Sequence, residues 1–389
     1  MSLKEPGFRV RMCGDWPATT GLAHAGRRLA LALHRGGIPL TLSEFASGAP
    51  RRDWLFPDEL QSLFSNMPSP ATLWTLNINE LQQAPDRELL RLPGQYNIAT
   101  WFWELPTMPD WMQAQFDRIS EIWAPTAFVE RTFLRYTSKP VHVVPPVVPI
   151  LTAEAPRPIL RQRLGLPLDR LIFSASFDFN SAVSRKNPLG IARAFAEAFP
   201  GSPRTGPLLV IKVVNLPASG SFATELRGAL ASVNGILIDR TFTDNEFAEL
   251  LHASDVYVSL HRSEGFGLGL AESMAIGKPV IGTAFSGNLD FMSIENSCLV
   301  GYRLREIDAD DHAHNPGIEA VYTEGAVWAE PDVQEAAAWM TVLAADSDLR
   351  SELGKAAAKT MMARFSPEAV CRIATDRLAE LFPELRPVG

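Results

Sequence analysis

The stretch Ser263–Glu272 reads SEGFGLGLAE, and it follows an apolar run at 255–260 that predicts a strand. Its three glycines stand at alternate positions, so the backbone N–H groups can approach an anion closely. A predicted helix at 268–276 begins inside the stretch, and its unpaired N–H groups and dipole favour a phosphate. The flanking Glu264 and Glu272 suit sugar and ribose hydroxyls, which donate hydrogen bonds to carboxylates. The stretch predicts a ligand with phosphates and hydroxyls, with a glycine-rich turn and a capping glutamate as the alternative.

Short apolar runs alternate with helical patterns on both sides of this stretch. Continuous apolar strands that alternate with helices predict parallel sheets covered on both faces, an α/β class. The first half contains predicted strands at 8–13, 38–42, 71–76, 96–102, 121–124 and 141–144, and a helix at 22–35. The second half contains strands at 171–176, 207–214, 236–240, 255–260 and 279–283, separated by helices at 188–199, 222–233, 244–252 and 268–276. Three further helices, at 333–345, 348–363 and 367–382, have no strand between them.

A proline-rich segment at 145–167 separates the two strand–helix series and marks the domain boundary. We expect an N-terminal Rossmann-like domain at 1–150, a linker at 151–168 and a C-terminal Rossmann-like domain at 169–365. The last helix, 366–389, is expected to cross back to the N-terminal domain. Ligands of doubly wound domains bind at the carboxyl ends of the strands, so we expect a ligand cleft between the two domains.

Three further segments follow predicted strands and carry polar or glycine residues. Arg185 and Lys186 come just before the helix at 188–199 and suit phosphates, although a solvated pair is the alternative. Gly21 opens the helix at 22–35, where a turn capped by a threonine is the alternative. Glu104 follows the aromatic run Trp101–Trp103, a pattern typical of sugar platforms and also of plain cores. Lys212, a lone charge in a strand, is interpreted as a surface residue.

The run from Glu264 to Glu272, followed by Gly277–Ile281, resembles the retaining glycosyltransferases of the GT-B fold, family four, and within them bacterial polysaccharide and mannosyltransferase-like enzymes. The resemblance implies two Rossmann-like domains that face each other across a cleft. It also implies that Glu264 contacts the donor sugar, that Glu272 contacts the ribose hydroxyls, and that the amides of 267–269 face a diphosphate. The candidate catalytic residues are Glu264, Lys186, Arg185 and Glu104. The candidate donor-binding residues are Glu272, Phe266, Gly267, Leu268, Gly269, Gly21 and Ser263.

The chain departs from the family pattern at two places. The family arginine that accompanies the lysine would fall at Ser181, so Lys186 is the firmer assignment and Arg185 is the expected substitute. The family histidine that touches the donor sugar has no counterpart near Glu104, which we take as its replacement. The segment 308–310 mimics a metal-binding aspartate pair but is interpreted as a solvated surface loop. The segment 328–332 is interpreted as structural, and no metal is expected.

Composition narrows the function classes. A formal net charge of −8 argues against nucleic acid as a partner. Three widely spaced cysteines fit a reduced cytoplasmic compartment. No apolar run approaches the roughly 18 residues of a membrane span, so we expect at most peripheral contact with the inner face of the membrane.

The resemblance implies transfer of a sugar, with retention, from a nucleoside-diphosphate donor to a hydroxyl of a glycan or lipid-linked glycan. GDP-mannose is the first expected donor and a UDP-sugar the next, and no cofactor is expected. Two alternatives remain open: a non-catalytic donor-binding subunit, and a sugar-nucleotide epimerase on the same fold.

Overall fold

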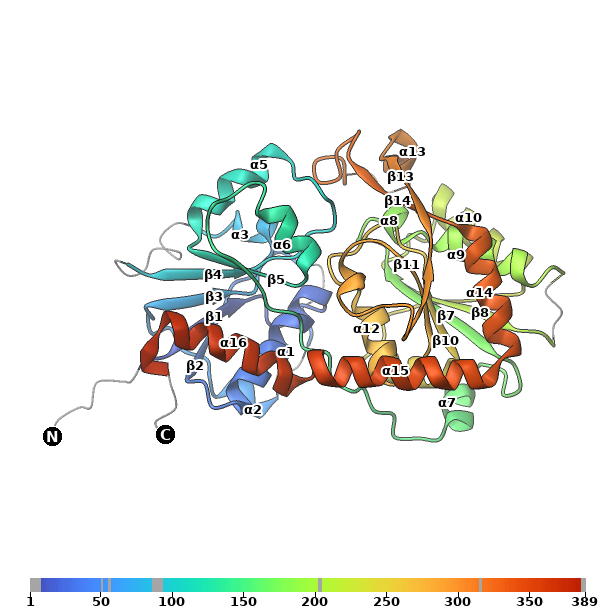
Figure 1. Cartoon of the computed structure of the whole chain (residues 1–389), viewed down its shortest axis with the longest axis horizontal. Helices are drawn as coiled ribbons and strands as arrows, with labels where there is room; N and C mark the ends of the chain where they lie inside the picture. The colour runs from blue at the N-terminus through green and yellow to red at the C-terminus, as the bar shows by residue number, and fades with distance from the viewer. Residues whose placement is uncertain are drawn as a thin grey trace. The chain divides into compact units, whose positions relative to one another are not determined.

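The computed structural model describes residues 8–49, 52–54, 57–85, 94–201, 205–314 and 317–385. The chain divides into two compact units (Figure 1). Unit 1 comprises Met1–Trp103, Met108–Val148 and Ala363–Gly389, and unit 2 comprises Glu104–Thr107 and Pro149–Met362. Each unit is built on one six-stranded parallel sheet with helices around it, so the predicted pair of Rossmann-like domains is confirmed.

Unit 1 has the strand order β2-β1-β3-β4-β5-β6, and all its strand pairs are parallel. The strand β1 is buried at every position, as expected for a strand inside a covered sheet. The elements are β1 (Val10–Gly14), α1 (Gly21–Arg35), β2 (Leu40–Glu44), α2 (Asp58–Gln61), β3 (Ala71–Trp74), α3 (Ile78–Leu81), β4 (Tyr96–Thr100), α5 (Asp110–Gln113), η1 (Ala114–Arg118), β5 (Glu121–Ala124), α6 (Ala127–Phe133), β6 (Val141–Val143), α16 (Pro367–Leu381) and η3 (Pro383–Leu385).

The C-terminal helix α16 packs on α1 in unit 1, so its predicted return to the N-terminal domain is confirmed. An ion pair fixes the helix to the sheet: Arg377 donates from Nε (3.0 Å) and Nη2 (2.6 Å) to the carboxylate of Glu121. Glu121 is fully buried in β5, and its carboxylate also accepts hydrogen bonds from Trp123 Nε1 and the Tyr96 hydroxyl. The charge of Glu121 is therefore compensated by one cation from a remote segment of the chain.

Arg377→Ala is expected to lower the free energy of unfolding by about 3 kcal/mol, because it leaves the buried Glu121 carboxylate without its cation. Urea unfolding at pH 7 measures this change. Arg372→Ala, an exposed arginine on the same helix, serves as the control and should change stability by less than about 0.5 kcal/mol. Equal effects of the two substitutions would contradict this role of Arg377.

Unit 2 has the strand order β12-β11-β10-β7-β8-β9. One apolar core lies between its sheet and the helices α9, α10 and α14, and a second core packs around α7 and α11. The elements are α7 (Arg157–Arg163), β7 (Ile172–Asp178), α8 (Val183–Lys186), α9 (Pro188–Ala198), β8 (Leu208–Val214), α10 (Ser221–Ser232), β9 (Ile236–Asp239), α11 (Asp244–Ala253), β10 (Val256–Ser259), α12 (Leu268–Ala275), β11 (Val280–Thr283), η2 (Gly287–Asp290), β12 (Cys298–Val300), β13 (Tyr302–Glu306), α13 (Ala309–Ala313), β14 (Val327–Pro331) and α14 (Val333–Ala345). The helix α15 (Ser347–Phe365) begins in unit 2 and ends in unit 1.

Two segments differ from the sequence interpretation. The expected linker contains the helix α7. Its proline Pro158 does not prevent the helix, because it stands in the first turn, where a proline is tolerated. The segment 308–310 is exposed, as expected, but it is not a loop, because Asp308 caps the helix α13. The adjacent Asp311 is buried against Arg305. Among the helices in the described part of the chain, none is both long and apolar enough to cross a membrane.

Candidate functional site

The glycine-rich loop leaves the carboxyl end of β10 and leads into α12. Gly267 is the N-cap of α12 and has a φ of +95°, in the left-handed region that a side chain disfavours. A Cβ at Gly269 would lie 2.3 Å from the buried Tyr257 hydroxyl, so only glycine fits there. Among the described residues, no side chain caps this helix end, and the first N–H groups of a helix have no partner within it. The start of α12 thus offers backbone donors to an anion.

The loop is held in place by the neighbouring segment 286–288. The Ser286 hydroxyl accepts a hydrogen bond from the Glu264 N–H (2.8 Å), and the Glu264 carbonyl accepts one from the Gly287 N–H (2.9 Å). Asn288 is fully buried and contacts His261 at 3.1 Å. Burial lowers the pKa of His261 and keeps it neutral at pH 7, although Glu264 opposes this effect. These contacts fix the backbone on which the Glu264 side chain stands.

A cluster of charged side chains surrounds Glu264. Its carboxylate lies 2.5 Å from Lys186 Nζ and 3.0 Å from Arg185 Nη1. Both cations come from α8, which follows β7, and β7 is the neighbour of β10 in the sheet. The carboxyl ends of two adjacent parallel strands therefore bring together Glu264, Lys186 and Arg185, as expected for a doubly wound domain.

Arg185 is fixed by the loops around it. Its guanidinium donates to the carbonyl of Ser263 (2.8 Å) and to that of Ser181 (3.1 Å). The family pattern has its arginine at the position of Ser181. In this chain the arginine stands four residues later, at Arg185, and the Ser181 carbonyl accepts a hydrogen bond from it. Ser263 is fully buried, and its hydroxyl contacts the carbonyl oxygen of Glu104, so the structure places it as a support of the loop.

Glu104 belongs to a four-residue segment that is part of unit 2, although its neighbours in sequence belong to unit 1. One carboxylate oxygen lies 3.6 Å from Arg185 Nη2, and the other accepts a hydrogen bond from the Tyr322 hydroxyl at 3.1 Å. The side chains of Glu104 and Lys186 are each 21% exposed, whereas that of Arg185 is 4% exposed. Glu104 and Lys186 are thus the most exposed members of the cluster, and the Glu264 side chain is 10% exposed.

The aromatic run before Glu104 is part of the core. Trp101 and Trp103 are 0% and 2% exposed, and Trp101 packs edge-on against Phe116 and Phe133. The interpretation of the two tryptophan rings as a sugar platform is therefore wrong, and for them the plain-core alternative holds.

Tyr322 was not predicted from the sequence, because it lies in a polar segment with no periodic pattern before β14. Burial raises the pKa of Tyr322, and Glu104 adds to this effect while Arg185 opposes it. The phenol therefore stays protonated and donates to Glu104. The only sequence signal for this residue is that an aromatic side chain stands in an otherwise polar stretch.

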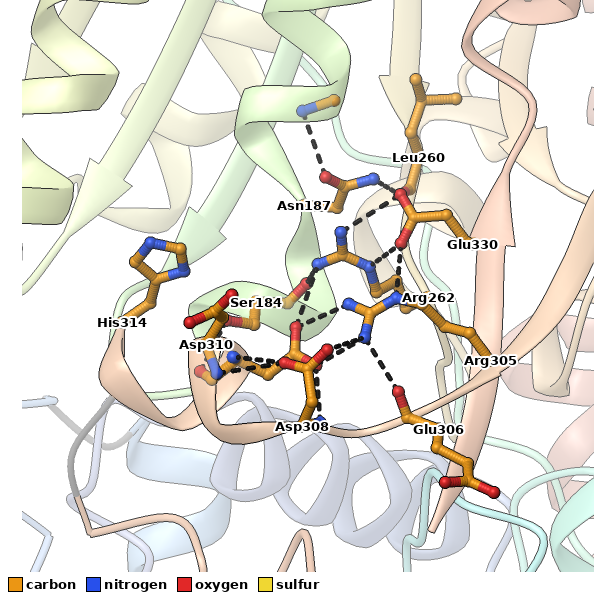
Figure 2. Close-up of polar contacts among 12 residues, drawn as sticks. Ser184, Asn187, Leu260, Arg262, Arg305, Glu306, Asp308, Asp310, His314 and Glu330 are labelled. Carbon is orange, nitrogen blue, oxygen red and sulfur yellow. Dashed lines mark hydrogen bonds and ion pairs between the residues drawn. The ribbon is translucent and has the colours of Figure 1, made fainter. Parts of the chain in front are cut away.

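A network of arginines and carboxylates supports α8 and the glycine-rich loop (Figure 2). Arg262 donates two hydrogen bonds to Glu330, at 2.7 and 3.2 Å, and Arg305 donates one to the same carboxylate at 2.9 Å. Arg262 also contacts the Ser184 carbonyl, and its N–H donates to the carbonyl of Arg185 (2.7 Å). The network thus links β14 to the backbone that presents the two cations, in keeping with a structural role for the segment 328–332.

The remaining candidates lie at three places. Glu272 is buried in α12 and is 6% exposed. The Phe266 side chain packs on Phe291 with ring centroids 5.0 Å apart, so it belongs to the core of the loop. Gly21 opens α1 in unit 1, and Thr20 caps that helix by accepting the Ala23 N–H. Among the residues that the structure describes, no group of three or more metal-ligating side chains converges on one point.

The pKa of Glu264 gives a pH dependence of stability. Burial raises this pKa, but Lys186 and Arg185 outweigh burial and lower it from 4.5 to about 2. A depressed folded-state pKa stabilises the fold above the unfolded-state value, and this stabilisation is lost as the pH falls from about 5 towards 2. The wild type should therefore lose about 2 kcal/mol more than Glu264→Gln between pH 6 and pH 3 in urea unfolding. Parallel losses in the two proteins would contradict the low pKa.

Comparisons with known proteins agree with this fold. Residues 236–300 match the family model Glycosyl transferases group 1, and this region contains the glycine-rich loop. Sucrose-phosphate synthase from Thermosynechococcus elongatus superimposes with a TM-score of 0.69 at 16% identity, covering 96% of this chain and 99% of its own. HepE from Anabaena, in complex with UDP-glucose, has a TM-score of 0.66 at 13% identity, covering 96% and 99%. A glycosyltransferase from Rickettsia africae has a TM-score of 0.64 at 12% identity, covering 97% and 99%. No curated protein sequence matches the chain.

These matches confirm the GT-B fold and the group 1 family match of the loop region. The assignment to family four, the mannosyl-type resemblance and the roles of the individual residues stay predictions.

Proposed function

We propose that this chain, which has the GT-B fold and a group 1 glycosyltransferase segment, transfers a sugar with retention from a nucleoside-diphosphate donor to a hydroxyl acceptor. One observation carries the proposal: Lys186 and Arg185 meet Glu264 beside the open N-terminus of α12. A donor has a diphosphate for the cations and helix amides, and it has sugar hydroxyls for the carboxylate.

The charges of the cluster around Glu264 suggest how the donor would bind. Arg185, Lys186, Glu264 and Glu104 sum to zero, so a diphosphate has to compete with the two carboxylates for the cations. We expect Lys186, the more exposed cation, to leave Glu264 and bind the diphosphate, while Glu264 turns to the sugar hydroxyls. The diphosphate that leaves in the reaction is then stabilised by two positive charges, without a metal ion in this scheme.

The protein contributes orientation and charge stabilisation in this proposal. Glu264 would hold the donor sugar, Glu272 would hold the ribose, and the departing diphosphate would take the proton of the acceptor hydroxyl. Holding donor and acceptor in one geometry lowers the barrier by making the encounter unimolecular. Glu104 would occupy the place of the missing family histidine, fixed by Arg185 and Tyr322.

Tyr322→Phe is expected to lower kcat about tenfold and to change KM and the melting temperature little, because Glu104 loses the hydrogen bond that orients it. Steady-state kinetics with the donor identified below measure this effect. Tyr302→Phe, which removes a hydroxyl from an exposed tyrosine on β13, is the matched control and should match the wild type. A fall in melting temperature with unchanged kcat would assign Tyr322 a purely structural role.

The donor base, the sugar and the acceptor are proposed at the level of chemical class. HepE was solved with UDP-glucose, and the resemblance to mannosyltransferase-like enzymes favours GDP-mannose, so both donors enter the test. For the acceptor we propose a glycan or a lipid-linked glycan, used in the cytoplasm or at the inner face of the membrane.

A thermal-shift screen against UDP-, GDP- and dTDP-sugars identifies the donor, because a bound ligand stabilises the fold by mass action. The donor that stabilises the protein should then release its nucleoside diphosphate slowly in water and faster with an acceptor. Conversion of the donor sugar into an epimer would favour the epimerase alternative, and binding without turnover would favour the non-catalytic subunit. Stabilisation by no nucleotide sugar would contradict the proposal.

A further inference from the structure

A polar cavity of about 290 Å³ lies in unit 2, and four of the nine residues that line it are arginines. Its charged lining consists of Arg157, Arg161, Arg170, Arg350, Asp169 and Asp255. The size is close to the lower end of small-molecule pockets, about 300 Å³. We call this cavity the arginine pocket.

The arginine pocket and the glycine-rich loop lie at opposite edges of one sheet. Leu171 and Asp255, which line the pocket, directly precede β7 and β10, whereas the loop and α8 follow the carboxyl ends of these strands. The two strands are parallel, so their amino ends meet at one edge and their carboxyl ends at the other. The pocket is therefore separate from the proposed donor site.

Three of the four arginines that line the pocket are held by two or more backbone carbonyls. Arg161 is 3% exposed and donates to the carbonyls of Ala253, Pro167, Leu168 and Arg170 and to the carboxylate of Asp255. Arg170 donates to Gly206 and Pro207 at 2.6 Å each. Arg350 donates to the carbonyls of Leu343 and Ala344 at the end of α14. A site fixed in this way loses little side-chain entropy when it binds.

Several guanidinium N–H groups remain available after these contacts. Within the described residues, no acceptor is hydrogen-bonded to Nη1 of Arg157, to Nη1 of Arg170, or to Nε and Nη2 of Arg350. Three different arginines thus retain donors at the wall of one cavity. Planar guanidinium donors from several arginines around one cavity suit an oxyanion such as phosphate.

The pocket also carries an uncompensated charge. Four arginines against two aspartates leave +2, in a chain whose total charge is −8. Lys278 lies near enough to interact electrostatically with Arg157, Arg161 and Asp255. Its ammonium donates to the carbonyls of His252 and Ser254. Burial lowers the pKa of Lys278 to about 8, and the charges of Arg157 and Arg161 add to this effect. Crowded cations of this kind favour an anion over an empty pocket.

We propose that the arginine pocket binds a phosphate-bearing anion at a site separate from the donor. The phosphate would sit among Arg157, Arg170 and Arg350, with Arg161 as the rigid floor. Two sources carry this chemistry: a small soluble phosphate ester or diphosphate, and the headgroup of an anionic phospholipid.

Calorimetric titration of the full chain with inorganic pyrophosphate tests the proposal. The double variant Arg157→Gln/Arg350→Gln should bind at least tenfold more weakly, since it loses two charged donors. Asp169→Asn, at an exposed residue, should bind about threefold more tightly because the pocket gains net positive charge. Arg163→Gln, on the same helix but outside the pocket, is the control and should equal the wild type. Circular dichroism checks the fold of each variant, and Asp169→Asn keeps the test decisive if the double variant unfolds.

Lys186→Met separates this site from the donor site. Pyrophosphate binding that persists in Lys186→Met and weakens in the pocket double variant supports the arginine pocket, whatever the fate of the proposed transferase activity. Binding that is lost in Lys186→Met and unchanged in the pocket variants would overturn the proposal.

Cosedimentation with vesicles distinguishes the two sources. Binding to phosphatidate vesicles but not to phosphatidylcholine vesicles, lost in the pocket double variant, identifies a lipid headgroup. Pyrophosphate binding without vesicle binding identifies a soluble ligand. Absence of binding in both assays would overturn the proposal.

Discussion

Lys186→Met is expected to lower the rate of nucleoside diphosphate release by about 10²- to 10³-fold. The ammonium of Lys186 lies 2.5 Å from Glu264, at the point where α8 and the start of α12 meet. In the proposed reaction it stabilises the negative charge that develops on the leaving diphosphate. Loss of one such preorganised group in other enzymes raises the barrier by about 3–4 kcal/mol. Methionine is unbranched and one atom shorter than lysine, so it keeps most of the side chain while removing the charge and its hydrogen-bond donors.

The measurement is the single-turnover release of nucleoside diphosphate at saturating donor. Lys355→Met, at an exposed lysine on α15, is the control and should retain the wild-type rate. A thermal-shift titration with the donor shows separately whether binding is lost. Normal turnover in Lys186→Met would remove this residue from the active site.

Glu264→Ala should combine a loss of activity with a loss of stability. It leaves Arg185, which is 3% exposed, beside Lys186 without the carboxylate that compensates both. Breaking a buried ion pair by removing one partner costs about 3–5 kcal/mol, and the exposure of Lys186 places this case near the lower end. Donor hydrolysis should fall at least 10³-fold, because in the proposed reaction Glu264 accepts hydrogen bonds from the donor sugar and holds the two cations in position.

Urea unfolding and donor hydrolysis measure the two effects of Glu264→Ala separately. The exposed Glu352→Ala on α15 is the control, with an expected change below about 0.5 kcal/mol. The double variant Glu264→Ala/Lys186→Met should recover part of the lost stability, since it removes one of the two uncompensated cations. Additive losses in the double variant would contradict the coupling between Glu264 and Lys186.

The parallel sheets were predictable because their strands are buried on both faces and so read as continuous apolar runs. The strands β8 and β10 illustrate this, since none of their observed ends differs from the expected end by more than one residue. The meeting of Glu264 with Lys186 was predictable as well, because strand-end loops of a doubly wound domain gather at one edge. The pattern therefore located the candidate site, although the residue roles still await the experiments above.

Other parts depend on tertiary contacts that leave no local pattern. The hydroxyl of Tyr322 donates to Glu104, which is 218 residues away in sequence. In the antiparallel pair of β13 and β14, each strand has five residues and most of β13 is exposed, so its sequence signal is weak. The segment that includes Glu104 belongs to unit 2, whereas the chain before and after it belongs to unit 1. The periodicity of apolar residues does not show which unit a short segment joins. The prolines at 156 and 158 are typical of a linker. In the structure, however, Pro156 is the N-cap of the helix α7 and Pro158 stands in its first turn.

A crystal structure of the full chain with a bound nucleoside diphosphate would test the proposed donor site. We expect the diphosphate at the N-terminus of α12, with its oxygens roughly 3 Å from the amides of 267–269 and from Lys186 Nζ. We also expect that Lys186 has moved from Glu264 towards the phosphates. A diphosphate bound away from α12, with the pair of Lys186 and Glu264 intact, would contradict this proposal.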